Sequence, residues 1–134
     1  MVCVHCGGRT NVINSRSQTR SNRIWRRRRC QNCSAIFTSL EQPLLETTWV
    51  VKRGSQLVPF SRDKLFLSIY NACKHRDEAI LDAGALTDTT IGGLSREKLT
   101  VFEPQHIVRL AINVLGSFDN AAAVQYHAFH PSAE

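Results

Sequence analysis

Residues 26–33 read Arg26-Arg27-Arg28-Arg29-Cys30-Gln31-Asn32-Cys33, so a run of four arginines stands directly before a Cys-x2-Cys pair. A second pair, Cys3-Val4-His5-Cys6, lies nearer the N-terminus, and 23 residues separate the two pairs. Four thiolates in two such pairs form the closed tetrahedral set that a structural Zn²⁺ prefers. We therefore predict a structural zinc site with the ligands Cys3, Cys6, Cys30 and Cys33.

Disulfides and unpaired buried thiols are the alternative interpretations of these cysteines. In a reducing cytosol, however, paired Cys-x2-Cys motifs more often bind metal. His5 lies inside the first pair, but four thiolates already fill a tetrahedral shell. A segment of about 40 residues buries too little apolar surface to fold alone, so we expect the metal to stabilise the fold. The fifth cysteine, Cys73, is predicted to be a small buried apolar residue in a helix.

Charge divides the chain into a basic head and a mildly acidic remainder. Residues 1–40 contain eight arginines, no lysine and no acidic residue, and all eleven acidic residues lie at or beyond Glu41. This asymmetry is typical of a nucleic-acid-binding arm, and arginine makes bidentate contacts with phosphate and guanine. A solvated basic face or a localisation signal is the alternative. The predicted DNA-binding residues are Arg16, Arg20, Arg23, Arg26, Arg27, Arg28 and Arg29.

Short antiparallel strands are predicted for the head. Residues 11–16 and 24–28 have strand character, and the polar turn between them contains Asn22, which tolerates positive φ. A third strand is predicted at residues 36–38, and Pro43 marks a linker, so the first domain is predicted to cover residues 1–42. Alternation along the second strand places Trp25, Arg27 and Arg29 on one face and Ile24, Arg26 and Arg28 on the other.

A second, mainly helical domain is predicted over residues 47–130. It begins with a β-hairpin, residues 47–53 and 56–58 around a turn at Gly54-Ser55. Ser61 is a suitable N-cap for a helix that fades near Arg76. The buried stripe predicted for this helix is Leu65, Ile69, Ala72 and Cys73.

Three further helices are predicted in the second domain. Residues 79–86 indicate a short helix, followed by a loop that contains Gly92-Gly93. Pro104 is typical of a first helical turn, and the helix that follows is expected to end near Gly116. A last helix is predicted over residues 120–129. Strands in the head and hairpin combined with these helices define an α+β protein.

Several motifs occur in the order and spacing of one family. They are Val12-Ile13-Asn14-Ser15-Arg16, the arginine run, the second cysteine pair followed by Phe37-Thr38 and Glu41, the Val51-Lys52-Arg53 hairpin, and Pro59-Phe60 followed by Arg62 and Lys64-Leu65. Over roughly residues 1–76 the chain thus resembles the bacterial NrdR repressors of ribonucleotide reductase genes. The resemblance implies a zinc ribbon that binds operator DNA and an ATP-cone domain, with a β-hairpin lid, that binds ATP or dATP. It also implies a homo-oligomer whose state, and hence DNA affinity, depends on the nucleotide.

Basic side chains of the second domain fit a phosphate site. Lys52 and Arg53 at the hairpin tip, with Lys64 one turn into the next helix, can converge on a triphosphate at a helix N-terminus. By pattern alone, ordinary surface charge is an equally good interpretation. The resemblance favours the nucleotide site and adds Val51 and Phe60 to it. The sequence has no P-loop, so we expect binding without hydrolysis.

The chain also departs from the family pattern. Gly54 directly follows Arg53, where the family commonly has an acidic residue before glycine. In the ribbon, Asn14 and Ile36 replace a common Asp and a common Arg. In the last helix, Ala123 and Gln125 stand where Tyr and Arg are common.

The predicted function is therefore a nucleotide-responsive transcriptional repressor, with Zn²⁺ as structural cofactor and double-stranded promoter DNA and adenine nucleotides as partners. Two alternatives are an ATP-cone protein that acts directly on ribonucleotide reductase, and a non-specific zinc-ribbon nucleic-acid-binding protein. The sequence shows no carboxylate pair, Cys-His pair or open metal site of the kind that an enzyme would need, so we do not expect catalysis. No stretch approaches the roughly 18 apolar residues of a membrane span, and no signal peptide is recognisable. We expect a cytoplasmic, nucleoid-associated protein without a membrane partner.

Overall fold

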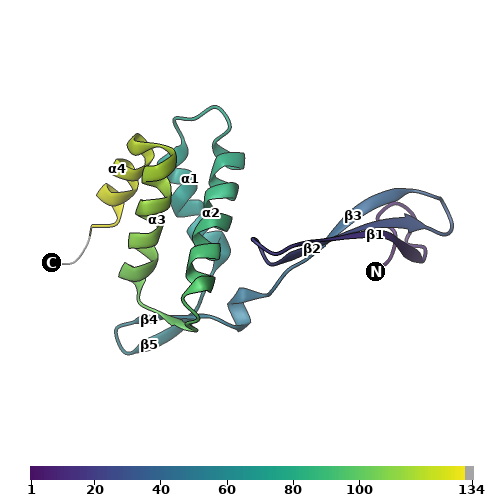
Figure 1. Cartoon of the computed structure of the whole chain (residues 1–134), viewed down its shortest axis with the longest axis horizontal. Helices are drawn as coiled ribbons and strands as arrows, with labels where there is room; N and C mark the ends of the chain where they lie inside the picture. The colour runs from purple at the N-terminus through teal and green to yellow at the C-terminus, as the bar shows by residue number, and fades with distance from the viewer. Residues whose placement is uncertain (132–134) are drawn as a thin grey trace. The chain divides into compact units, whose positions relative to one another are not determined.

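The computed structural model describes residues 1–131 and divides into two compact units, residues 1–43 (unit 1) and the chain from Leu44 onward (unit 2). Unit 1 consists of antiparallel strands and carries the four cysteines, and unit 2 combines four α-helices with a small mixed sheet in its described part. Figure 1 shows these elements along the chain. The predicted α+β class is confirmed.

Unit 1 is built on one three-stranded sheet in the order β1-β2-β3. Its strands are β1 (Thr10–Gln18), β2 (Arg23–Cys30) and β3 (Ile36–Glu41), each longer than the sequence indicates. Asn22 has φ +49° in the turn between β1 and β2, as predicted. The register between β1 and β2 shifts between Val12 and Asn14, so Ile13 is the extra residue of a β-bulge.

The sheet of unit 2 joins segments distant in sequence. β4 (Val50–Arg53) and β5 (Gln56–Pro59) form the predicted hairpin, with Gly54 at φ +60° in its turn. On its other edge β4 pairs in parallel with β6 (Val101–Phe102). A 3₁₀ helix, Leu45–Thr47, precedes β4. β6 was not predicted, because a strand of two residues shows no periodicity in the sequence.

Four α-helices follow: α1 (Arg62–Cys73), α2 (Ala79–Arg96), α3 (Pro104–Phe118) and α4 (Asn120–Phe129). The Ser61 hydroxyl accepts a hydrogen bond from the Lys64 N–H, which confirms the predicted N-cap of α1. Pro104 opens α3, also as predicted, although the helix continues two residues past Gly116. None of the helices within residues 1–131 combines the length and apolarity needed to cross a bilayer.

The predicted loop at Gly92-Gly93 is wrong, because α2 continues through both glycines to Arg96. A side chain at Gly93 would stand 2.8 Å from a Leu110 methyl, so glycine at this position lets α2 and α3 approach closely. Polar residues on the buried face of α2 are also satisfied within the helix: the hydroxyls of Thr87 and Thr90 donate to carbonyls one turn earlier, at 2.6 and 2.8 Å. These glycine and threonine residues therefore allow α2 to pack closely against its neighbours, although their sequence pattern is typical of loops.

Three aromatic rings lie at the centre of the unit 2 core. Trp49 packs edge-on against Phe60 and Phe102, with ring centroids 5.3 and 5.1 Å apart. Phe102 is fully buried, so short strand β6 brings a large apolar side chain between the hairpin and the helices. The predicted stripe of α1 is confirmed, since these residues are all buried: Leu65, Ile69, Ala72 and Cys73.

Small residues allow α3 and α4 to pack together. A side chain at Gly116 would meet the Ala123 methyl at 3.9 Å, and Ala123 is buried. The alanine that departs from the family pattern is therefore part of the core, whereas Gln125 is exposed. A larger side chain at position 123 would need a wider separation of the two helices.

Asp119, between α3 and α4, forms a compact polar junction. Its Oδ2 accepts hydrogen bonds from His75 at 2.8 Å and Arg76 at 3.0 Å, and its Oδ1 accepts from the N–H groups of Ala121 and Ala122. The bond from His75, followed by that from Arg76, holds the pKa of Asp119 well below its usual range. The junction therefore ties the end of α1 to the start of α4 through a charged carboxylate.

We expect Asp119→Asn to lower the Tm of unit 2 at pH 7, because the amide keeps the N-cap but loses the charge. A lowered pKa contributes stability above the unfolded value of about 3.9, and this contribution is lost as the pH falls through the folded value. The Tm difference should therefore shrink between about pH 4 and pH 2, measured by circular dichroism. Asp77→Asn, an exposed neighbour, is the control; an unchanged difference at low pH would contradict this assignment.

Candidate metal centre and nucleic-acid interface

The sulfur atoms of Cys3, Cys6, Cys30 and Cys33 converge in unit 1. All four lie within 4.8 Å of one another. The Cys3 and Cys33 sulfurs are 3.7 Å apart, and those of Cys6 and Cys30 are 3.4 Å apart. Zn–S bonds of about 2.3 Å in a tetrahedron require sulfur separations of about 3.8 Å. The cluster therefore fits a Zn²⁺ ion with only small adjustments.

Backbone hydrogen bonds shape the two cysteine loops for this task. In the first, the Cys3 N–H donates to Gly8 at 2.8 Å and the Gly7 N–H donates to Cys3 at 3.0 Å, with Gly7 at φ +72°. In the second, the Cys30 N–H donates to the Ala35 carbonyl at 2.9 Å. Each pair of cysteines is thus placed at a tight turn, which is why the spacing Cys-x2-Cys directs two sulfurs to one point.

Neighbouring N–H groups favour the thiolate form that metal binding needs. The N–H of Cys33, opposed by burial and assisted by the N–H of Asn32, lowers the pKa of Cys30 to about 6. For Cys33 the N–H of Ala35 acts in the same direction, but the adjacent Cys6 sulfur and burial outweigh it and raise the pKa to about 12. Four adjacent sulfurs cannot all carry a negative charge unless a cation balances them, and Zn²⁺ meets this requirement.

The sheet of unit 1 has two chemically different faces, because cross-strand partners point to the same side. Arg16 pairs with Trp25 and Trp25 with Leu40, while Arg27 pairs with Asn14 and Thr38. We call this side the Trp25 face; it consists chiefly of Arg16, Trp25, Arg27, Arg29, Thr38 and Leu40. The opposite side, the Glu41 face, consists chiefly of Ser15, Arg26, Arg28, Phe37, Ser39 and Glu41. The alternation predicted for the second strand is confirmed.

Arginines on the Glu41 face bind to the protein itself. Arg26 forms an ion pair with Glu41 at 3.1 Å and donates to the Ser15 hydroxyl at 3.2 Å. Arg28 donates to the Ser39 hydroxyl at 2.9 Å. Both side chains are half-buried. They hold the strands together, whatever else they contact.

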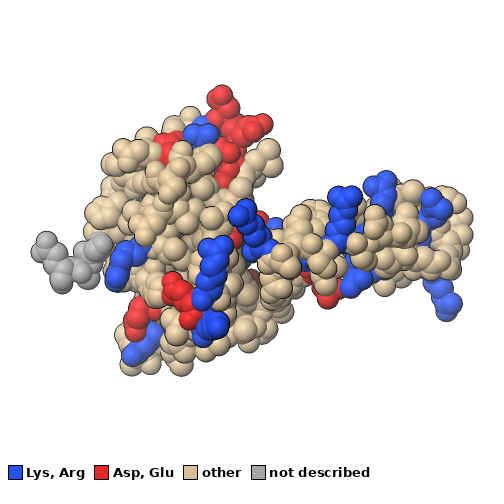
Figure 2. Space-filling model, in the orientation of Figure 1, with Lys and Arg blue, Asp and Glu red and all other residues tan. Residues whose placement is uncertain are grey.

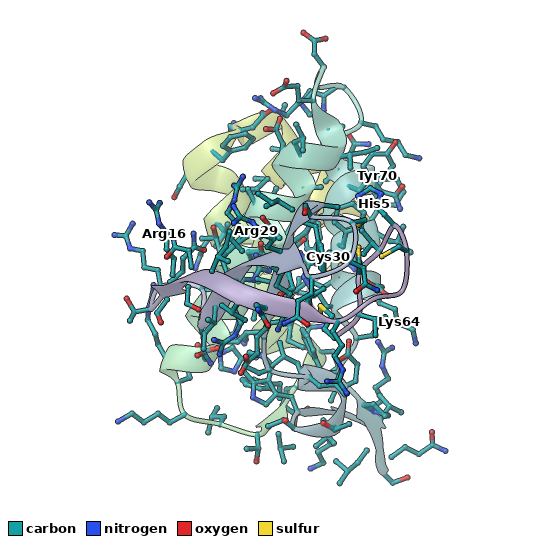
Figure 3. All side chains as sticks on the ribbon, turned by 90° about the vertical axis from the view of Figure 1, so that its right-hand side faces the viewer. His5, Arg16, Arg29, Cys30, Lys64 and Tyr70 are labelled. Atoms are coloured by element: carbon teal, nitrogen blue, oxygen red, sulfur yellow. The ribbon has the colours of Figure 1, made fainter. Side chains whose placement is uncertain are left out.

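Arginines on the Trp25 face are exposed and, within residues 1–131, make no ion pair with a carboxylate: Arg16, Arg27 and Arg29. Figure 3 shows Arg16 and Arg29 on the same side of the sheet. Arg20 lies in the exposed turn between β1 and β2, and Arg23 is the first residue of β2. In Figure 2 blue side chains are spread along unit 1, whereas red ones are mostly on unit 2.

The residues predicted for nucleotide binding lie on adjacent elements of unit 2. Val51 and Phe60 are buried in its core, so they fix the hairpin to the helices. Lys52 and Arg53 are exposed at the end of β4, and Lys64 is exposed in the first turn of α1. No contact among the described residues joins Lys64 to the two hairpin side chains. The register of the hairpin places Arg53 opposite Gln56 at the turn, whereas the chain enters α1 from Pro59 at the other end, so the structure shows no completed phosphate site.

Trp25 and Arg62 were not assigned a role from the sequence. Trp25 is an exposed tryptophan among arginines, and strand alternation already indicated the face on which it lies. Arg62 donates to Asp88 at 2.7 Å, yet its Nε is buried without a hydrogen-bond partner in the described chain. Only the packing of α1 against α2 reveals that arrangement.

Four cysteines at the end of an arginine-rich antiparallel sheet, followed by an α+β unit, define a zinc-ribbon protein with a cationic sheet. The family described as Transcriptional repressor NrdR-like, N-terminal domain, matches residues 1–41.

Relatives named Transcriptional repressor NrdR extend the similarity to most of the chain. The protein of Sphingopyxis alaskensis is 33% identical over 131 residues, which cover 94% of this chain and 82% of the relative. That of Halomicrobium mukohataei is 32% identical over 127 residues, with 94% and 78% covered. That of Methylobacterium nodulans is 34% identical over 131 residues, with 94% and 66% covered. The chain belongs to the NrdR family of transcriptional repressors, which confirms the resemblance seen in its motifs, and its ribbon and four-cysteine cluster support a structural zinc ion.

Proposed function

We propose that this protein is a nucleotide-responsive repressor that binds promoter DNA of ribonucleotide reductase genes through unit 1. The observation that carries the proposal is a sheet beside a four-cysteine cluster, with exposed arginines and no carboxylate before Glu41. Such a surface attracts the phosphates of double-stranded DNA, and its groups can also reach base edges. The protein then acts at the nucleoid in the cytoplasm, as a regulator and not as an enzyme.

Unit 2 is the proposed sensor, an ATP-cone that binds ATP or dATP. In support, Lys52 and Arg53 end one strand of a hairpin whose base is fixed in the core by Val51 and Phe60. Lys64 adds a positive charge near the α1 N-terminus, where the helix dipole also favours phosphate. The identity of the nucleotide would set the oligomeric state and thereby the affinity for DNA.

We expect fluorescence anisotropy to show that the zinc-loaded protein binds a ribonucleotide reductase promoter duplex more tightly than a scrambled duplex, by a factor of about a thousand or more. Both affinities should fall as salt rises, because phosphate contacts release counterions. Equal affinity for the two duplexes would instead indicate a non-specific nucleic-acid-binding protein. A stable complex with the reductase, without promoter binding, would indicate an accessory protein of that enzyme.

A further inference from the structure

Trp25 occupies an unusual position for a large apolar side chain. It is 39% exposed on β2, the central strand of the sheet, and its cross-strand partners are Arg16 on β1 and Leu40 on β3. Its neighbours on the same face of β2 include Arg27. Cys3 and Cys30 are the buried residues of unit 1, so the indole ring is not part of a buried core and is accessible to a ligand.

Beside Trp25 the surface is hollowed. An open hollow of about 510 Å³ is lined by Arg16, Ser17, Gln18 and Trp25. One wall is an aromatic ring, another is a guanidinium group, and the remaining groups are polar. This combination suits a nucleotide unit, whose sugar or base packs on a ring and whose phosphate binds arginine.

Charge on the Trp25 face favours DNA over an apolar protein partner. Glu41, the nearest acidic residue in sequence, lies on the opposite face and pairs with Arg26. Alternate residues on a strand are about 6.7 Å apart, close to the rise over two nucleotides along one DNA strand. The three side chains of this face on β2, Trp25, Arg27 and Arg29, therefore present one group for about every two nucleotides.

We infer that the Trp25 face is the DNA-contacting face, that Trp25 and Arg16 hold one nucleotide of the duplex between them, and that Arg26 and Arg28 position the strands. The inference rests on the proposed function and assigns different roles to arginines that are indistinguishable in the sequence. The indole lies against a sugar or base within the groove, and the three arginines of the face bind the flanking phosphates.

Tryptophan fluorescence of the full chain tests the contact directly. The chain has two tryptophans, of which Trp49 is only 6% exposed. Without DNA, acrylamide should quench the Trp25 emission; with saturating promoter duplex that component should be protected.

Trp25→Phe should remove the Trp25 component of the emission and keep most of the affinity for the duplex. Trp25→Ala should weaken binding roughly 5- to 150-fold, which corresponds to the roughly 1–3 kcal/mol for stacking a base on an aromatic side chain.

Salt titrations of four zinc-loaded variants test the face assignment. Arg27→Gln and Arg29→Gln should each reduce the slope of log K against log salt by about one. Arg26→Gln and Arg28→Gln, on the same strand, should leave the slope unchanged. The inference would be overturned if all four variants reduced the slope equally, or if only the Arg26 and Arg28 variants reduced it. It would also be overturned if the promoter bound without protecting Trp25 from acrylamide. Failure of the unmodified protein to bind either duplex would instead remove the proposed function, and the inference with it.

Discussion

Cys30→Ala is expected to abolish zinc binding and unfold unit 1, while unit 2 remains folded. Among residues 1–43, all of which the structure describes, Cys3 and Cys30 are the buried residues, so the metal centre is effectively the core of the unit. Structural zinc contributes about 10–16 kcal/mol in small zinc-binding peptides at pH 7. No apolar cluster in unit 1 can replace a contribution of that size.

Zinc content, measured by atomic emission, and promoter binding together check this expectation. The variant should hold much less than one zinc per chain and lose DNA binding, whereas circular dichroism should show that the helices of unit 2 persist. Cys73→Ala is the matched control, because Cys73 is a buried thiol of unit 2 outside the cluster. Full zinc stoichiometry in the Cys30 variant would show that the ligand assignment is wrong.

Phe102→Ala should lower the free energy of unfolding of unit 2 by about 3–5 kcal/mol. Phe102 is fully buried and packs edge-on against Trp49, 5.1 Å between ring centroids. Removing the ring leaves a cavity where β6 joins the hairpin to the helices. Since β4 pairs with β6 in this region, the hairpin that carries Lys52 and Arg53 should also become less well fixed.

Urea denaturation followed by circular dichroism at the helical band checks this value, because all α-helices in the described chain belong to unit 2. Val101→Ala is the matched control: it changes the adjacent residue of the same strand, whose side chain is 47% exposed. We expect the control to change the free energy of unfolding by less than about 1 kcal/mol. Equal effects of the two variants would contradict the central place of Phe102 in the core.

The metal centre was predictable because its determinants are local. Each Cys-x2-Cys pair forms its own turn, so spacing alone indicates that two sulfurs meet, and the two pairs share one sheet. The helices α1 and α3 were predictable for a similar reason, since Ser61 and Pro104 mark their starts and apolar residues recur at helical spacing.

What escaped prediction depends on contacts between distant residues. Gly93 suggests a loop in the sequence, but in the fold it lies in α2 against Leu110 of α3, where no side chain fits. The two residues of β6 form a strand because they pair with β4. Strand alternation correctly separated Trp25 from Arg26, but the partners of each arginine became visible only with the register of β3. The nucleotide residues remain a prediction, because Lys52, Arg53 and Lys64 are exposed and make no contact with one another in the described chain.

Promoter affinity measured with ATP and then with dATP tests the central claim most directly, since it asks whether unit 2 controls unit 1. The account predicts that the Kd of the zinc-loaded protein for the promoter duplex differs at least about fivefold between the two nucleotides, the lower end of typical allosteric coupling. Lys64→Gln should remove the difference, whereas Lys74→Gln, at the other end of α1, should keep it. The same Kd with ATP, with dATP and without nucleotide would contradict the account.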